Sequence, residues 1–117
     1  MGTKTQPKPQ KTAAVTYAIH ESEDACKMQT VKLKGRITED NALECVGSYE
    51  DSGSNVWELG RPKFHHMMTD AMSDKFKVIV VTNATSISRN TDQMRSFVQL
   101  FKDKSISVIF TEIGRRD

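Results

Sequence analysis

This chain of 117 residues has only two cysteines, no long apolar run and no clear excess of one charge. No apolar stretch approaches the roughly 18–20 residues that a membrane-spanning helix requires, and no hydrophobic segment of a signal peptide is visible. Hydrophobic residues make up 37% of the chain and charged residues 27%, which is typical of a globular protein. We therefore expect a single cytoplasmic domain that has no membrane partner.

Cys26 and Cys45 are the only cysteines, and they do not form a Cys-x-x-Cys pair. Both fall on segments that are predicted to form core elements, where free cysteine is commonly buried. We predict two buried, reduced thiols and neither a disulfide nor a cysteine metal site. The adjacent His65 and His66 do not share a helix face, so we expect no metal ligands there either.

The charge balance changes when the first twelve residues are set aside. Residues 1–12 carry three of the 17 basic residues and no acid, and they read as a disordered basic arm, a linker or a cloning remnant. Residues 13–117 then hold 14 basic and 15 acidic residues, a net charge of −1. A body without a basic excess could bind nucleic acid only through a local patch, the arm or a further segment.

Apolar periodicity predicts an alternation of strands and helices. The continuous apolar segment 78–81 is typical of a strand that helices cover on both faces. Helices are predicted after a Ser22 cap, from Pro62, and after an Asn90 cap that resembles a capping box with Gln93. This alternation implies an α/β three-layer sandwich with a mainly parallel central sheet of four or more strands. The predicted strands are 13–19, 42–49, 78–81 and 106–110, with turn residues at 50–55 opening a loop to about Gly60. The predicted buried helix positions are Cys26, Thr30, Leu33 and Ile37, then Phe64, Met67, Met68, Ala71 and Met72, and finally Met94, Phe97, Val98 and Phe101.

Two common nucleotide cradles are missing from the sequence. No Gly-x-Gly-x-x-Gly follows the first predicted strand, and no Gly-x-x-x-x-Gly-Lys-Ser/Thr occurs anywhere. We therefore expect no nucleotide cofactor, and indeed no cofactor of any kind.

Four short blocks within residues 15–112 resemble the catalytic domain of serine site-specific recombinases, the resolvases and invertases. In that family the first strand ends Tyr-x-Arg-Val-Ser-Thr, and an active-site loop usually reads Asp-Arg-Leu/Ile-Ser-Arg. Between them lie Asp-x-Gly-x-Ser-Gly and Arg-Pro-x-Phe. The corresponding segments of this chain are 17–22, 49–54, 61–64 and 85–89. The resemblance implies a resolvase-like catalytic-domain fold for residues 13–117.

The family's chemistry uses the strand-end serine to attack a DNA phosphate, while arginines stabilise the charge of the transition state. This chain has Glu21 at the serine position and Ile19 at the neighbouring arginine position. In the loop, Thr85 and Ser86 replace the aspartate and the first arginine. The polar residues that still match the family are Tyr17, Gln29, Arg61 and Arg89.

These replacements predict a catalytically degenerate domain. Loss of one preorganised charge-stabilising donor commonly costs about 10²–10³-fold in rate. A carboxylate at ~4 Å from a phosphate would repel it by roughly 1–4 kcal/mol. We expect an interaction, assembly or regulatory module linked to DNA recombination, in a bacterial, phage or mobile-element context. Its partner would be a protein or a second copy, with weak DNA contact through Arg61 and Arg89.

Two alternatives stay open from the sequence alone. An active recombinase domain could use Ser22 as the nucleophile after a one-residue slip, although Ser22 is more simply a helix cap. An unrelated α/β binding or signalling module would share only the topology, and residues 19, 21, 85, 86 and 89 would then be scattered. The sequence also allows a Glu21–Arg89 salt bridge, and it allows Arg61 to be a solvated residue at a helix start.

Overall fold

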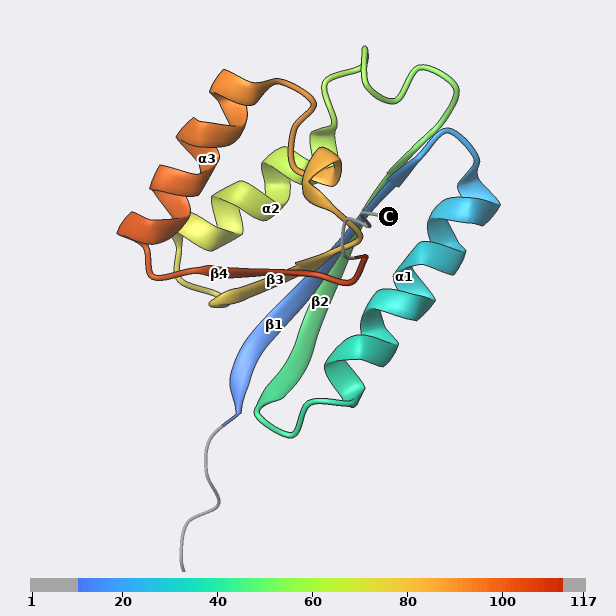
Figure 1. Ribbon diagram of the computed structural model, residues 1–117. Coiled ribbons are helices and arrows are strands. Elements are labelled where there is room, and N and C mark those ends of the chain that lie inside the picture. Colours follow the sequence, from blue (N-terminus) through green and yellow to red (C-terminus); the bar gives the residue numbers. More distant parts are fainter. Residues whose placement is uncertain (1–10, 113–117) are drawn as a thin grey trace, which may run out of the picture.

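The computed structural model describes residues 11–112, in which four parallel strands form one sheet in the order β2-β1-β3-β4 (Figure 1). The strands are β1 (Thr12–His20), β2 (Leu43–Ser52), β3 (Val78–Val81) and β4 (Ser107–Phe110). The helices are α1 (Glu23–Thr38), α2 (Pro62–Met72) and α3 (Thr91–Asp103), with a short 3-10 turn η1 (Ala84–Ser86). Of the predicted arm, residues 1–10 lie outside the described part of the chain, and Thr12 already belongs to β1.

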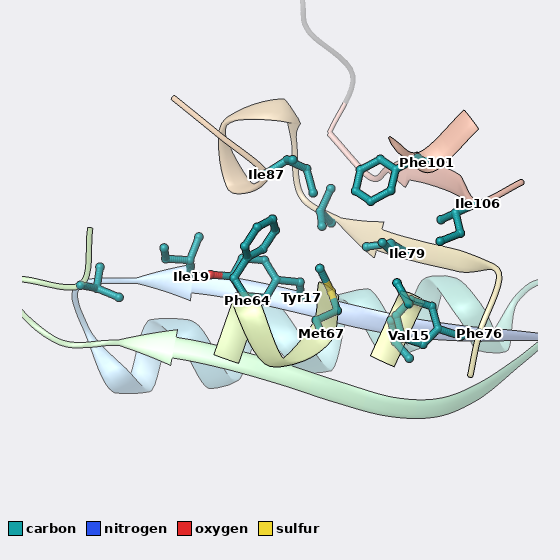
Figure 2. Close-up of a cluster of buried hydrophobic side chains, with 13 residues drawn as sticks. Val15, Tyr17, Ile19, Phe64, Met67, Phe76, Ile79, Ile87, Phe101 and Ile106 are labelled. Atoms are coloured by element: carbon teal, nitrogen blue, oxygen red, sulfur yellow. The ribbon is translucent and has the colours of Figure 1, made fainter. Parts of the chain in front are cut away.

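The sheet is the middle of three layers, as the alternation of elements predicted. Helix α1 covers one face, and α2 and α3 lie on the other (Figure 1). Each face has its own apolar cluster, and the larger one lies under α2 and α3. Figure 2 shows this larger cluster, in which the Phe64 ring meets the Tyr17 ring edge to face at 5.2 Å between centroids. The smaller cluster comprises Ala14, Ala18, Cys26, Leu33, Ile37, Leu43, Val78 and Val80, with Ile109 packed against it.

The second strand is longer than its sequence suggested. Residues 50–52, which the pattern assigned to a turn, continue the pairing with β1 as far as Ser52 beside His20. A register shift between Ala14 and Val15 leaves Val46 as an extra residue on β2. Parallel pairing with a long β1 outweighs the local turn preference, so β2 delivers Asp51 to the carboxyl end of the sheet.

The helix caps largely follow the predicted chemistry. The Ser22 hydroxyl accepts a hydrogen bond from the Ala25 amide at 3.2 Å, and the Asn90 side chain accepts one from the Gln93 amide at 2.9 Å. The reciprocal half of the predicted capping box is wrong. The Asn90 amide donates to the Ser88 hydroxyl at 3.0 Å, and that hydroxyl donates to the side-chain oxygen Oε1 of Gln93 at 2.9 Å. Ser88 therefore links the loop to the start of α3.

Three predicted core positions are exposed. Met72 is the last residue of α2, and its side chain is 38% exposed. Val98 is 42% exposed because it faces a groove on the outer side of α3. Cys45 is exposed because it lies on an edge strand, next to the register shift. No helix within residues 11–112 has the length and apolar character needed to cross a bilayer.

The two thiols should therefore react differently. Burial raises the pKa of Cys26 to about 11, and its side chain is inaccessible. At about pH 8 we expect an aromatic disulfide reagent to modify about one thiol per native chain, at Cys45, and two after unfolding in urea. Cys45→Ser should abolish the native reaction, whereas Cys26→Ser should leave it unchanged. Fast modification of two thiols in the native protein would contradict the burial of Cys26.

Candidate functional site

Residues from four separate segments meet in a pocket at the carboxyl ends of the strands. The pocket has a volume of about 310 Å³ and lies between the end of β1, the loop around η1 and Trp57. We call it the Glu21 pocket; its lining residues are Ile19, His20, Glu21, Gln29, Trp57, Thr82, Asn83, Thr85, Ser86 and Arg89. All five positions that the sequence argument singled out at 19, 21, 85, 86 and 89 are among them. The scatter expected of an unrelated module is therefore not observed.

A buried carboxylate, Asp51, pairs in the sheet with Ile19 of the pocket, and its role left little sign in the sequence. Asp51 is only 4% exposed and accepts three hydrogen bonds. The Tyr17 hydroxyl donates to its Oδ2 at 2.8 Å, and the amides of Lys63 and Phe64 donate to Oδ1 and Oδ2 at 3.0 and 2.9 Å. Asp51 thus caps α2 from the end of β2, where its charge also complements the helix dipole. Only its place in the Asp-x-Gly block hinted at this role.

Arg61 is buried and holds the loop around η1 in place. Its backbone is left-handed, with φ of 51°, and only 7% of the residue is exposed. The guanidinium donates to the carbonyl oxygens of Ser86 and Ile87 at 2.9 and 2.7 Å. The interpretation of Arg61 as a solvated residue is therefore wrong. The arginine fixes the loop that lines the Glu21 pocket.

Two aromatic rings and two guanidinium groups alternate in a stack that includes Arg61. The Arg61 guanidinium carbon lies 4.0 Å from the centre of the Phe64 ring and 4.8 Å from that of Trp57. The Arg89 guanidinium carbon lies 4.2 Å from the same Trp57 ring. We call Phe64, Arg61, Trp57 and Arg89 the cation–π column. Such contacts contribute about 0.5–2 kcal/mol each. The sequence carried no signal for Trp57, which lies in a loop without periodicity.

The Glu21–Arg89 salt bridge that the sequence allowed is not formed. Both residues line the pocket, but Arg89 packs on Trp57, and no ion pair within residues 11–112 involves either side chain. An exposed ion pair contributes little, so stacking on an aromatic ring can outweigh it.

The other family-like residues have structural contacts. The Gln29 amide donates to the Ile19 carbonyl at 3.2 Å, and its oxygen accepts from the Thr82 hydroxyl at 3.4 Å. Gln29 thereby ties α1 to the ends of β1 and β3. Ser22 is engaged as the α1 cap, and its amide donates to His20 Nδ1 at 2.9 Å.

The pocket's chemistry is that of a polar recess with one carboxylate, one guanidinium and one imidazole, those of Glu21, Arg89 and His20. Within residues 11–112, no group of three or more His, Cys, Asp or Glu side chains is placed to hold a metal ion. Thr82, Asn83, Thr85 and Ser86 add neutral donors and acceptors around Glu21 and Arg89.

Fold and pocket together define an α/β domain of the serine recombinase type. Residues 17–117 match the sequence model of the resolvase N-terminal domain, and the chain belongs to this family.

Solved structures agree with this fold. The C-terminal catalytic domain of ISC1926 TnpA, an IS607-like serine recombinase, matches with a TM-score of 0.75 and 17% identity over 90% of this chain and 71% of that one. The N-terminal catalytic domain of TP901-1 integrase matches with a TM-score of 0.72 and 18% identity over 84% and 75% of the two chains. A resolvase family site-specific recombinase from Streptococcus pneumoniae matches with a TM-score of 0.70 and 23% identity over 86% and 72%. A search of curated proteins found no match.

The two tyrosines of the chain should resist ionisation in the folded state. Burial and then the Asp51 hydrogen bond raise the pKa of Tyr17 far above its ordinary value; burial and then the Asp70 hydrogen bond do the same for Tyr49. The unfolded chain loses these protons near pH 10, whereas the folded chain keeps them. This contribution to stability is therefore complete below about pH 10 and is lost as the pH rises further. We expect tyrosinate absorbance to appear only together with unfolding, and Tyr17→Phe to reduce the alkaline loss of stability. Tyrosinate in a protein with native circular dichroism near pH 10 would contradict both assignments.

Arg61→Met should destabilise the fold by about 3 kcal/mol, because two loop carbonyls lose their charged donors and the column loses its centre. The free energy of unfolding in urea measures this effect. Lys63→Met, at an exposed side chain two residues away, is the matched control and should change stability by about 0.5 kcal/mol or less. Equal effects of the two substitutions would show that the Arg61 contacts contribute nothing.

Proposed function

We propose that this domain does not cleave DNA and that it acts as an interaction, assembly or regulatory module in DNA recombination. The observation that carries the proposal is the composition of the Glu21 pocket. Where the family resemblance implies a serine and an arginine, the pocket presents Glu21 and Ile19. Membership of the resolvase family supports the link to recombination.

Electrostatics supports the lack of cleavage. A phosphodiester entering the Glu21 pocket would meet a carboxylate and only one guanidinium, that of Arg89. Thr85 and Ser86 contribute only neutral groups there, and their amides already donate to Asn83. Neutral donors stabilise a developing negative charge less than arginines do. The Arg61 guanidinium is held by the carbonyls of Ser86 and Ile87, so it cannot replace the missing charge without releasing the loop.

The local structure also opposes an active site based on Ser22. Its hydroxyl caps α1, and it does not line the Glu21 pocket. To attack a phosphate, Ser22 would have to leave the helix end, at a cost of about 1 kcal/mol, and it would still lack an arginine at position 19 or 86. The expected partner is instead another protein or a second copy of the chain. It would bind the folded domain without any catalytic step.

A covalent-trapping experiment tests the proposal. The protein is incubated with labelled duplex DNA from the region flanking its own gene, denatured, and resolved by electrophoresis. We expect no protein–DNA adduct and no strand cleavage from the parent chain or from Ser22→Ala. An adduct that forms with the parent and disappears with Ser22→Ala would show an active recombinase and refute the proposal.

A further inference from the structure

The outer face of α1 carries apolar side chains where a surface helix is usually polar. Met28 is 64% exposed and Val31 is 69% exposed, and both lie on the side of the helix that points away from the sheet. One exposed apolar side chain is ordinary on a protein surface. These two are three residues apart, so they adjoin on the helix and form one patch. The buried residues on the opposite side of α1 are Cys26, Thr30, Leu33 and Ile37.

Gly35 extends this patch by one more turn of the helix. It is exposed, and apart from its own turn of backbone nothing lies within 4 Å of the place that a Cβ would occupy. Glycine weakens a helix relative to alanine, and packing within residues 11–112 gives no reason for a glycine here. Met28, Val31 and Gly35 have the spacing of positions a, d and a in a heptad, the positions that face a partner helix. We call these three residues the α1 ridge.

Lysines border the α1 ridge on both sides. Lys27 and Lys34 lie along one side and Lys32 along the other, at the heptad positions whose charges select the partner in paired helices. Lys32 and Lys34 form no ion pair within the described part of the chain. The charged residues between positions 25 and 38 are all basic; they are Lys27, Lys32, Lys34 and Arg36. The ridge is therefore an apolar strip inside a basic border.

This combination selects the kind of partner. A second copy that docked through the same ridge would bring lysine against lysine in either orientation of the two helices, which is repulsive. A lipid surface would require more and larger apolar side chains than Met28 and Val31. A nucleic-acid strand would meet the lysines but would offer no apolar surface to the ridge. A helix with an apolar stripe and acidic borders matches both the ridge and its lysines.

We propose that the α1 ridge docks one amphipathic helix of a protein partner, with apolar residues at the centre of its contact face and Asp or Glu on both sides. This inference rests on the proposed function as an interaction module, and it specifies the surface and the chemistry of the partner. None of the three ridge residues lines the Glu21 pocket, and α1 lies across the sheet from α2 and α3 (Figure 1). Residues 28–35 span about two helical turns, so the contact is short and the complex dissociates readily.

Designed peptides test the proposal. A fluorescein-labelled helical peptide of about three heptads carries leucine at a and d and glutamate at e and g, and the glutamates oppose its pairing with itself. One comparison peptide replaces every glutamate with lysine, and another replaces every leucine with serine. The full chain is titrated into each peptide, and the fluorescence anisotropy is measured. We expect only the first peptide to bind, with an affinity that falls as salt is added.

Substitutions on two different helices locate the contact. Val31→Ser should weaken binding of the acidic peptide about tenfold, because the peptide loses an apolar contact. Val98→Ser, the same change at an exposed valine of α3 across the sheet, should leave the affinity unchanged. Both valines are exposed, so both variants should keep a melting temperature close to that of the parent.

An exchange of charge is the sharper test. The double variant Lys32→Glu, Lys34→Glu should lose at least about tenfold in affinity for the acidic peptide and should bind the lysine peptide instead. The double variant Arg95→Glu, Lys102→Glu changes the net charge by the same amount at exposed positions of α3. It should keep the parent's preference for the acidic peptide.

The outcomes separate this inference from the proposed function. It is overturned if the acidic peptide does not bind, if either comparison peptide binds equally well, or if the α3 variants lose affinity as the α1 variants do. A dimer of the chain that Val31→Ser dissociates in sedimentation would assign the ridge to a second copy and would also overturn it. Binding to phosphatidylserine vesicles that Val31→Ser abolishes would assign the ridge to a lipid surface, with the same consequence. A covalent DNA adduct in the trapping experiment would refute the proposed lack of cleavage and would leave these binding results unaffected.

Discussion

The buried Arg61 guanidinium connects the core of this domain to its candidate site. It lies over the ring of Phe64, which belongs to the larger apolar cluster, and it donates to the carbonyls of Ser86 and Ile87. These two hydrogen bonds fix the position of the loop after β3. They also satisfy a buried charge that would be costly without hydrogen-bond acceptors. Asp51 completes the arrangement by capping α2, the helix that begins beside Arg61. The shape of the Glu21 pocket depends on these two buried charges.

The same arrangement separates residues that support the fold from residues that line the Glu21 pocket. Tyr17, Gln29 and Arg61 keep contacts that hold the strand ends, α1 and the loop together. These contacts stabilise the fold irrespective of what the pocket binds. Ile19, Glu21, Thr85 and Ser86 line the pocket, where substitutions alter the electrostatic environment without removing the supports. The four residues that differ from the family pattern all line the pocket, whereas Tyr17 and Arg61 support it from outside and Gln29 does both.

The apolar periodicity of the sequence was enough to predict the order of strands and helices. A continuous apolar strand or a helix with one apolar stripe can bury its apolar residues in few arrangements. Periodicity failed where the end of a strand or the burial of a residue depends on a neighbouring element of the fold. β2 runs through a predicted turn because β1 pairs with it as far as Ser52. Val98 and Met72 match the apolar stripes of their helices but remain exposed, since no other element within residues 11–112 covers them. Cys45 shows the same effect on an edge strand. The convergence of positions 19, 21, 85, 86 and 89 was predictable, because carboxyl ends of parallel strands meet at one edge of the sheet.

The sequence by itself determined the three-layer α/β architecture, the caps at Ser22 and Asn90, and the residues that meet at the strand ends. These features follow from short-range patterns and from the topology that such patterns permit. Only the tertiary structure decided that Arg61 is a buried anchor, that Arg89 packs on Trp57 instead of pairing with Glu21, and that Asp51 caps α2. Each of those contacts joins residues from different elements, and its strength depends on burial and ring geometry, which exist only after the layers have packed.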